Sequence, residues 1–168
     1  MNSKIFKSFK NVFDNNFELL IGFGSIFIIS LAILLDKYLY LQACPLCILT
    51  RYVFALVATV SMVGFFINKK KFSYVLILIT SAIGACVTGR QIYIQNMSIE
   101  DIASLSGCSM PFHTQVEYFG AYEAIKRTLA GGPSCAEDGL RFIFNFAEWG
   151  FVFFLMFMFM CAIKLKNN

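Results

Sequence analysis

The sequence has few charged residues, very few prolines and a single histidine. Asp, Glu, Lys and Arg make up 14% of its 168 residues, against roughly 25% in soluble domains. Hydrophobic residues make up 58%, and 20 residues are Phe, which is more apolar surface than one soluble core of this size can bury. The composition therefore argues against a soluble enzyme, a disordered chain or a nucleic-acid binder. The single histidine excludes a multi-histidine metal or haem site.

Long apolar stretches indicate a membrane protein instead. A helix needs about 17–25 mostly apolar residues to cross the hydrocarbon core of a bilayer. Four stretches of this chain meet that requirement: 19–35, 46–68, 72–90 and 143–163. Four segments are too few to close a barrel, so their backbone groups must be satisfied within helices. We therefore expect an all-α membrane protein, a four-helix bundle formed by one domain over residues 1–168, with loops at 36–45 and 91–141.

Basic residues predict the orientation of this bundle, because loops rich in Lys and Arg stay in the cytoplasm. Lysines precede the first stretch, join the second to the third and follow the fourth: Lys4, Lys7, Lys10, Lys69, Lys70, Lys71, Lys164 and Lys166. We therefore expect both termini in the cytoplasm and both loops on the outer side. Lysines before an apolar stretch also occur in secretory signal sequences. Asp36 and Lys37 interrupt the approach to a cleavage site before Cys44, so we expect the first helix to be retained.

The long outer loop is predicted to carry short amphipathic helices. Ser98 and Asp101 have the spacing of a helix capping box. Further on, apolar side chains recur every three or four residues from Val116 to Leu129, before Gly131. Such a helix lies either on the outer leaflet or against the other loop, and the sequence leaves both arrangements open.

The six cysteines fall into two groups by their expected depth. Cys86 and Cys161 lie inside apolar stretches, where a thiol usually behaves as a small hydrophobic group. The other four lie at the outer side: Cys44, Cys47, Cys108 and Cys135. The outer side is where disulfides persist, and no cysteine occurs in a segment expected in the cytoplasm.

Cys44 and Cys47 form a Cys-x-x-Cys motif at the start of the second helix, a pattern that redox sites and zinc sites share. Pro45 suits the first position of a helix, which places Cys47 in the first turn, where free amides and the helix dipole favour a thiolate. Arg51 follows one turn deeper on the same face. An arginine just inside the membrane is costly and usually functional, although its side chain can also simply extend to the headgroups.

Two dithiol pairs on the outer side suggest an electron relay, because thiol–disulfide exchange passes two electrons between such pairs. A pair in the loop can reach a soluble partner, and a pair at a helix end can reach a molecule dissolved in the bilayer. Zinc binding by four cysteines is the alternative, but zinc knuckles prefer two close pairs, and Cys108 and Cys135 are far apart in sequence. We therefore expect no metal, and we expect His113 to be a solvated loop residue.

These residues resemble the disulfide bond formation protein B (DsbB) family. The resemblance covers nearly the whole chain from Phe17 onward. It rests on the four helices and on these elements: Cys44 to Cys47 followed by Arg51, the long loop with Cys108, Cys-Ala-Glu at 135–137 and Ala-Glu-Trp at 147–149. The last of these departs from the family's Pro-Glu-Trp element by an alanine in place of the proline.

The resemblance implies a quinone-dependent thiol oxidase of the bacterial inner membrane. Such a protein reoxidises a periplasmic thioredoxin-fold dithiol oxidase (DsbA-like) and passes the electrons to ubiquinone or menaquinone. By this resemblance the reduced partner attacks Cys108, Cys135 exchanges with Cys44, and Cys47 faces the bound quinone.

Two further residues are implied at the quinone. Arg51 would stabilise the Cys47 thiolate and the negative charge that develops on the quinone. Gln91 stands where many relatives have a histidine near the quinone, and its amide can still donate a hydrogen bond.

Two other functions remain open from the sequence. A vitamin K epoxide reductase-like protein also has four helices and redox cysteines, although its Cys-x-x-Cys motif lies on a late helix. A non-catalytic membrane subunit would use its disulfides only to staple the outer loops together. The enzyme cycles its disulfides, whereas in the structural subunit they are inert.

Overall fold

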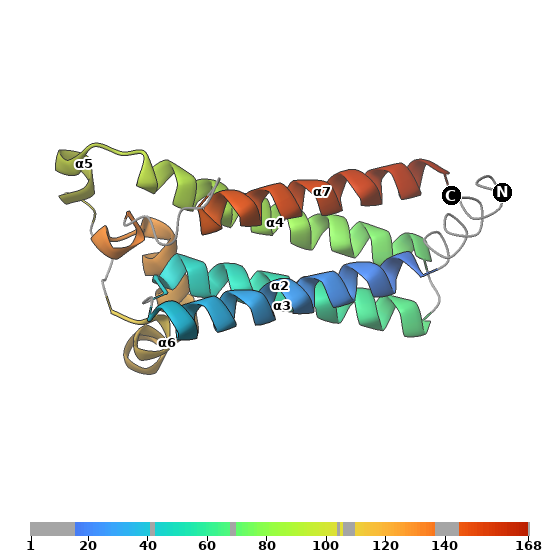
Figure 1. Ribbon diagram of the computed structural model, residues 1–168, viewed down its shortest axis with the longest axis horizontal. Helices are drawn as coiled ribbons and strands as arrows, with labels where there is room; N and C mark the ends of the chain where they lie inside the picture. Colours follow the sequence, from blue (N-terminus) through green and yellow to red (C-terminus); the bar gives the residue numbers. More distant parts are fainter. Residues whose placement is uncertain are drawn as a thin grey trace.

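Four long helices run side by side along the length of the molecule (Figure 1). The computed structural model describes residues 16–40, 43–67, 70–103, 105, 110–136 and 145–167. The long helices are α2 (Phe17–Leu39), α3 (Pro45–Ile67), α4 (Lys70–Gln95) and α7 (Phe146–Asn167). Three shorter elements gather at one end, hereafter the distal end: α5 (Ile99–Ala103), α6 (Phe112–Ala130) and the 3₁₀ helix η1 (Pro133–Cys135). α2 begins and α7 ends at the opposite end.

The four long helices are each long and apolar enough to cross a membrane. Many of their large apolar side chains are exposed around the bundle, among them Phe27, Phe66 and Phe159. Surfaces of this kind are stable in contact with lipid rather than water. Within the described ranges every regular element is helical. The expectation of an all-α, four-helix membrane bundle is confirmed.

Two helices extend beyond the apolar stretches from which they were predicted. α2 continues to Leu39 instead of ending at residue 35, because the charge of Asp36 is paired with Arg51 of α3 and does not interrupt the helix. α4 continues to Gln95 instead of ending at residue 90. The connecting segments at the distal end are correspondingly shorter than the expected loops.

α7 begins at Phe146, later than the expected start at residue 143, and a capping box explains this boundary. The Asn145 side-chain oxygen accepts a hydrogen bond from the Glu148 backbone N–H, and the Glu148 carboxylate accepts one from the Asn145 backbone N–H, both at 2.9 Å. Asn145 Nδ2 also donates to Gln95 Oε1 at 3.0 Å. The start of α7 is thereby joined to the end of α4.

The bundle is built from two closely packed helix pairs. α2 packs on α3, α7 packs on α4, and the contact of α3 with α4 joins the pairs. In the core the ring of Phe54 stacks on that of Phe154, with centroids 4.1 Å apart. Gly84 of α4 permits the close approach of α7, because a Cβ at this position would overlap the Phe154 ring. Among the described residues, α2 and α7 do not form a close pair of their own.

A second apolar cluster lies at the distal end, where α6 and η1 pack on α3 and α4. Its buried members are Leu46, Leu49, Val87, Ile94, Phe112, Ala124 and Cys135. The predicted pairing of Ser98 with Asp101 at the start of α5 is present: the Ser98 hydroxyl accepts a hydrogen bond from the Asp101 backbone N–H at 3.3 Å and donates one to the Asp101 carboxylate at 2.6 Å. The distal end is therefore a packed layer over the ends of two membrane helices.

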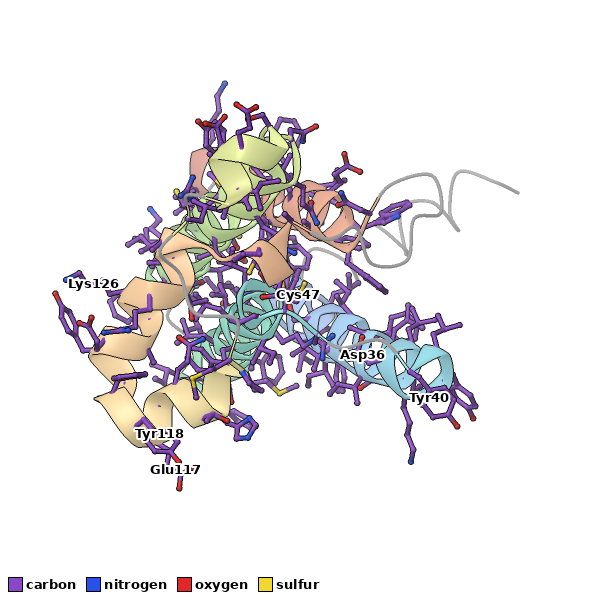
Figure 2. All side chains as sticks on the ribbon, turned by 90° about the vertical axis from the view of Figure 1, so that its left-hand side faces the viewer. Asp36, Tyr40, Cys47, Glu117, Tyr118 and Lys126 are labelled. Carbon is purple, nitrogen blue, oxygen red and sulfur yellow. The ribbon has the colours of Figure 1, made fainter. Side chains whose placement is uncertain are left out.

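α6 contacts the bundle through Phe112 at its start and then through small and polar side chains, whereas its later aromatic side chains are exposed. Ala124 and Thr128 are buried, whereas Tyr118 and Tyr122 are 73% and 83% exposed. The helix bends at Gly120, where the φ of 79° favours glycine. Viewed along the bundle from the distal end, α6 lies to one side with Tyr118 at its outer corner (Figure 2). Most of the predicted apolar stripe thus points away from the other helices, and only its first residue, Val116, packs against the distal cluster.

Candidate active site at the distal end

The Cys-x-x-Cys pair lies at the first turn of α3. Pro45 occupies the first helical position, where a missing backbone N–H leaves no hydrogen bond unmade. Cys44 therefore stands at the helix cap, and its sulfur accepts a hydrogen bond from the Cys47 backbone N–H at 3.3 Å. The two sulfur atoms are 3.2 Å apart, and both thiols are free. Small side-chain rotations are enough to bring them to disulfide geometry.

Cys135 reaches this pair from η1, and two contacts hold its segment against the helices. Gly131 has a φ of 83° and lies so close to Ile94 that a side chain would overlap it. Arg90 donates hydrogen bonds from Nε and Nη2 to the last two carbonyls of α6, at 3.2 and 3.0 Å. η1 then contacts both α3 and α4. The loop cysteine is therefore fixed beside the cysteines at the head of α3.

The contact between Cys135 and Cys44 shifts the pKa values of the two thiols in opposite directions. The Cys135 sulfur accepts hydrogen bonds from the Cys44 thiol and from the Leu46 backbone N–H. The Cys44 hydrogen bond is the main cause that lowers the pKa of Cys135 from 9.0 to about 6, against the opposing effect of burial. The same hydrogen bond, together with one to Cys47, raises the pKa of Cys44. Cys44 is thus the less acidic thiol and the hydrogen-bond donor of this cluster, and Cys135 is the more acidic one.

Gln91 of α4 stands on the other side of the pair. Its Nε2 donates to Cys47 Sγ at 2.9 Å and lies 3.7 Å from Cys44 Sγ. The side chain is buried, so its amide points at the sulfurs rather than at solvent. An amide donor at this distance stabilises negative charge on Cys47.

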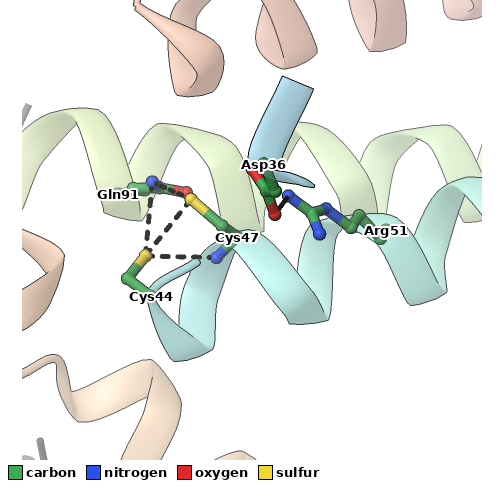
Figure 3. A network of polar contacts seen from close by, with 5 residues as sticks. All are labelled: Asp36, Cys44, Cys47, Arg51 and Gln91. Carbon is green, nitrogen blue, oxygen red and sulfur yellow. Dashed lines mark hydrogen bonds and ion pairs between the residues drawn. The ribbon is translucent and has the colours of Figure 1, made fainter. Parts of the chain in front are cut away.

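Arg51 lies one turn deeper than Cys47 and is paired with a residue that the sequence reasoning missed (Figure 3). Its Nη2 donates to Asp36 Oδ2 of α2 at 2.6 Å. The available signal was an isolated acidic residue directly after an apolar stretch, since a charge at that depth is costly without a partner. What the sequence lacked was the packing of α2 on α3, which brings the two side chains together.

A cavity of about 960 Å³ leads from these residues along the bundle between α2 and α7. Cys44, Cys47, Arg51 and Gln91 line its distal part. Its remaining walls are mostly apolar and come from the two helices that do not pack closely: Leu20, Phe27, Leu31, Trp149, Phe153 and Met156. Several of these wall residues are exposed, so the cavity opens sideways on the apolar surface of the bundle. The volume suits a ligand of ordinary cofactor size.

Other residues singled out in the sequence lie elsewhere. Cys108 lies outside the described residues. Cys86 is exposed on α4, and Cys161 is buried in the core near the end of α7, away from the distal cysteines. His113 is exposed on α6. In the part of the chain that the structure describes, no three His, Cys, Asp or Glu side chains are arranged to hold a metal ion.

Comparison with known proteins identifies the family. The sequence model described as "Disulfide bond formation protein DsbB" matches residues 14–164. Three similar proteins are named "Disulfide bond formation protein B". The one from Xylella fastidiosa (strain 9a5c) is 28% identical over 134 residues, 76% of each chain. The one from Polaromonas naphthalenivorans (strain CJ2) is 28% identical over 139 residues, 80% of this chain and 81% of the relative. The one from Marinobacter nauticus is 29% identical over 142 residues, 79% of this chain and 83% of the relative. With the family matched over most of its length and paired cysteines at the head of α3, the chain belongs to the DsbB family of disulfide bond formation proteins.

Proposed function

We propose that this protein is a quinone-dependent thiol oxidase. It reoxidises a soluble thioredoxin-fold dithiol protein of the DsbA type and passes the electrons through two cysteine pairs to a membrane quinone, ubiquinone or menaquinone. The observation that carries the proposal is the hydrogen-bonded contact of Cys135 with Cys44, because it joins the loop pair to the helix pair.

The proposed location is the bacterial inner membrane, with the whole chain 1–168 acting as one membrane domain. The distal end faces the periplasm in this arrangement. Lys70, Lys164 and Lys166 support it, since they lie at the opposite end of the bundle, where α4 begins and α7 ends. Positive residues of this kind stay on the cytoplasmic side.

Electrons enter at the loop pair in the proposed reaction. A thiolate of the reduced partner attacks Cys108 of a Cys108–Cys135 disulfide, so that a mixed disulfide forms and Cys135 leaves as a thiolate. The backbone N–H groups of Leu46 and Gly132 favour this step, because hydrogen bonds to the Cys135 sulfur make it a better leaving group even while Cys44 is held in a disulfide. The partner's second thiolate then attacks the mixed disulfide, which releases the oxidised partner and leaves Cys108 reduced.

The electrons then pass to the helix pair. The Cys135 thiolate attacks Cys44 of a Cys44–Cys47 disulfide, so that a Cys135–Cys44 bond forms and Cys47 leaves as a thiolate. Cys108 restores the loop disulfide by attacking Cys135, and Cys44 leaves in its turn. Gln91 assists the first of these exchanges, since its amide donates to the sulfur of Cys47. The two electrons now reside on the Cys44 and Cys47 thiols.

The cavity fits a quinone as the final acceptor. Its distal part offers the N–H donors of Arg51 and Gln91 for ring oxygens, and its apolar walls suit an isoprenoid tail. When bound, the quinone takes up two electrons and two protons, which returns Cys44 and Cys47 to a disulfide. The guanidinium of Arg51 cannot lose its proton, so it provides a fixed positive charge where negative charge develops.

The test is rapid mixing of the purified protein with a quinone and a reduced thioredoxin-fold donor, with quinone reduction followed by absorbance. We expect turnover in the wild-type protein and none in Cys44→Ser. Arg51→Ala should raise the apparent KM for the quinone about tenfold or more, since a nearby charge is worth about 1–3 pKa units of about 1.4 kcal/mol each. Lys37→Ala removes an exposed charge from the same end and should change little. Disulfides that stay intact without quinone reduction would show that the cysteines only staple the loops.

A further inference from the structure

An acidic side chain, that of Asp36, lies against Arg51 in the wall of the cavity. Asp36 Oδ2 lies 2.6 Å from Arg51 Nη2, with the two side chains 19% and 22% exposed. Both residues line the cavity. Figure 3 shows Asp36 reaching from α2 to the Arg51 guanidinium, beside Cys47. The pair therefore connects the two helices next to the sulfur that is proposed to deliver the electrons.

Arg51 needs a partner to stay beside the cavity. Its backbone lies only about two turns below the distal end of α3, and long basic side chains extend toward water or headgroups where they can reach them. The contact with Asp36 holds the guanidinium at the depth of the cavity instead. Because this contact uses Nη2, the other N–H groups of the planar fork remain available to a ligand.

We infer that Asp36 is a positioning residue for the quinone site: its carboxylate holds the Arg51 guanidinium beside Cys47, pointing into the cavity. This role rests on the proposed function, because it concerns the same quinone. The alternative is a purely structural role, in which the pair only ties α2 to α3 and supports the fold whatever the cavity binds. The two roles differ in what the loss of Asp36 changes: a positioning role predicts weaker quinone binding, and a purely structural role predicts lower thermal stability with unchanged quinone binding.

The experiment measures quinone binding without turnover. Trp149 is the single tryptophan of the chain and lines the cavity. Quinones quench tryptophan fluorescence, so a titration of the oxidised protein with a short-tailed ubiquinone gives an apparent Kd. The proteins compared are the wild type, Asp36→Asn, Asp36→Glu, Arg51→Ala and the double variant Asp36→Asn with Arg51→Ala. Thermal unfolding of each shows that it is folded.

We expect Asp36→Asn to raise the apparent Kd about tenfold, which corresponds to about 1.4 kcal/mol. Asp36→Glu keeps the carboxylate and should stay close to the wild type. In the Arg51→Ala background Asp36→Asn should cause no further loss, since the group that it positions is gone. Glu117→Gln removes an exposed carboxylate from α6, on the far side of the bundle from Asp36 in Figure 2, and should leave the Kd unchanged.

An unchanged Kd in Asp36→Asn would overturn the inference. So would an equal further loss in the Arg51→Ala background, because additive losses show that Asp36 does not act through Arg51. Asp36→Ala provides a second neutral variant with the same expected result if Asp36→Asn does not fold. A wild-type protein without saturable quenching would instead refute the quinone reaction itself, and that result is distinct from a wild type that binds while Asp36→Asn binds equally well.

Discussion

Lowering the pH should neutralise Cys135 in a range where an ordinary thiol is already uncharged. With a pKa of about 6, Cys135 is about 90% thiolate at pH 7, whereas a thiol with the ordinary value of 9.0 is about 1% thiolate at that pH. The hydrogen bond from the Cys44 thiol is the main cause of the lowered pKa. Replacing Cys44 by alanine should therefore move the midpoint of ionisation upward, toward 9.0.

The assay is the ultraviolet absorbance of the thiolate in the fully reduced protein, followed against pH. The difference between Cys47→Ser and the double variant Cys47→Ser with Cys135→Ser isolates Cys135 while keeping Cys44 in place. The remaining cysteines are common to both proteins and cancel in the difference. The expected midpoint is near pH 6, and the same pair of proteins with Cys44→Ala provides the comparison.

The sign of the effect on stability follows from the direction of the pKa. Because folding lowers the pKa of Cys135, the contribution of its thiolate to the stability of the reduced protein is complete above pH 9.0 and is lost as the pH falls through about 6. A midpoint that stays near 9.0, or one that does not respond to Cys44→Ala, would refute the reasoning. Either result would separate the loop cysteine from the helix pair and remove the main support for the relay.

Two further predictions concern the packing of the core and the order of thiol exchange. Gly84→Ala places a methyl group against the Phe154 ring and should cost about 1–3 kcal/mol, measured as a lower Tm, whereas Gly24→Ala meets nothing within 4 Å and should not lower it. An equal Tm in both variants would contradict the close contact of α4 with α7. Cys135→Ser should trap the partner as a mixed disulfide on Cys108, seen on a non-reducing gel, because no resolving thiol remains in the loop. Cys108→Ser should abolish that complex, and a partner cross-linked elsewhere would mean that the order of transfer is wrong.

The sequence was sufficient to predict the architecture, because apolar length is a strong and local signal. The four membrane helices follow from it, and the pairing of Ser98 with Asp101 follows from residue spacing alone. The head of the second helix was also predictable, since Pro45 fixes where α3 begins and therefore where Cys47 stands. Gln91 was singled out only through the family resemblance, and the structure places it 2.9 Å from Cys47 Sγ.

Contacts between distant segments could not be read in the same way. The approach of Cys135 to Cys44 depends on Gly131, which lets the segment after α6 lie directly against α4, and on Arg90, which binds the last carbonyls of α6. The sequence does not indicate which residues Gly131 and Arg90 contact. The pairing of Asp36 with an arginine on the next helix likewise depends on how the two helices are rotated against each other, which their uniformly apolar stretches do not specify.

Because the cavity opens sideways between α2 and α7, its occupancy depends on the concentration of the ligand in the membrane rather than in water. A molecule that enters between Phe27 and Met156 arrives from the lipid and never crosses bulk water. Its supply is set by its mole fraction in the bilayer and by diffusion within a plane. Detergent and lipid chains have the same access, so they compete for the opening in proportion to their own amount. An apparent Kd measured in micelles then reflects competition between the quinone and detergent chains for the cavity. It changes when the detergent is diluted while the protein and quinone concentrations stay constant.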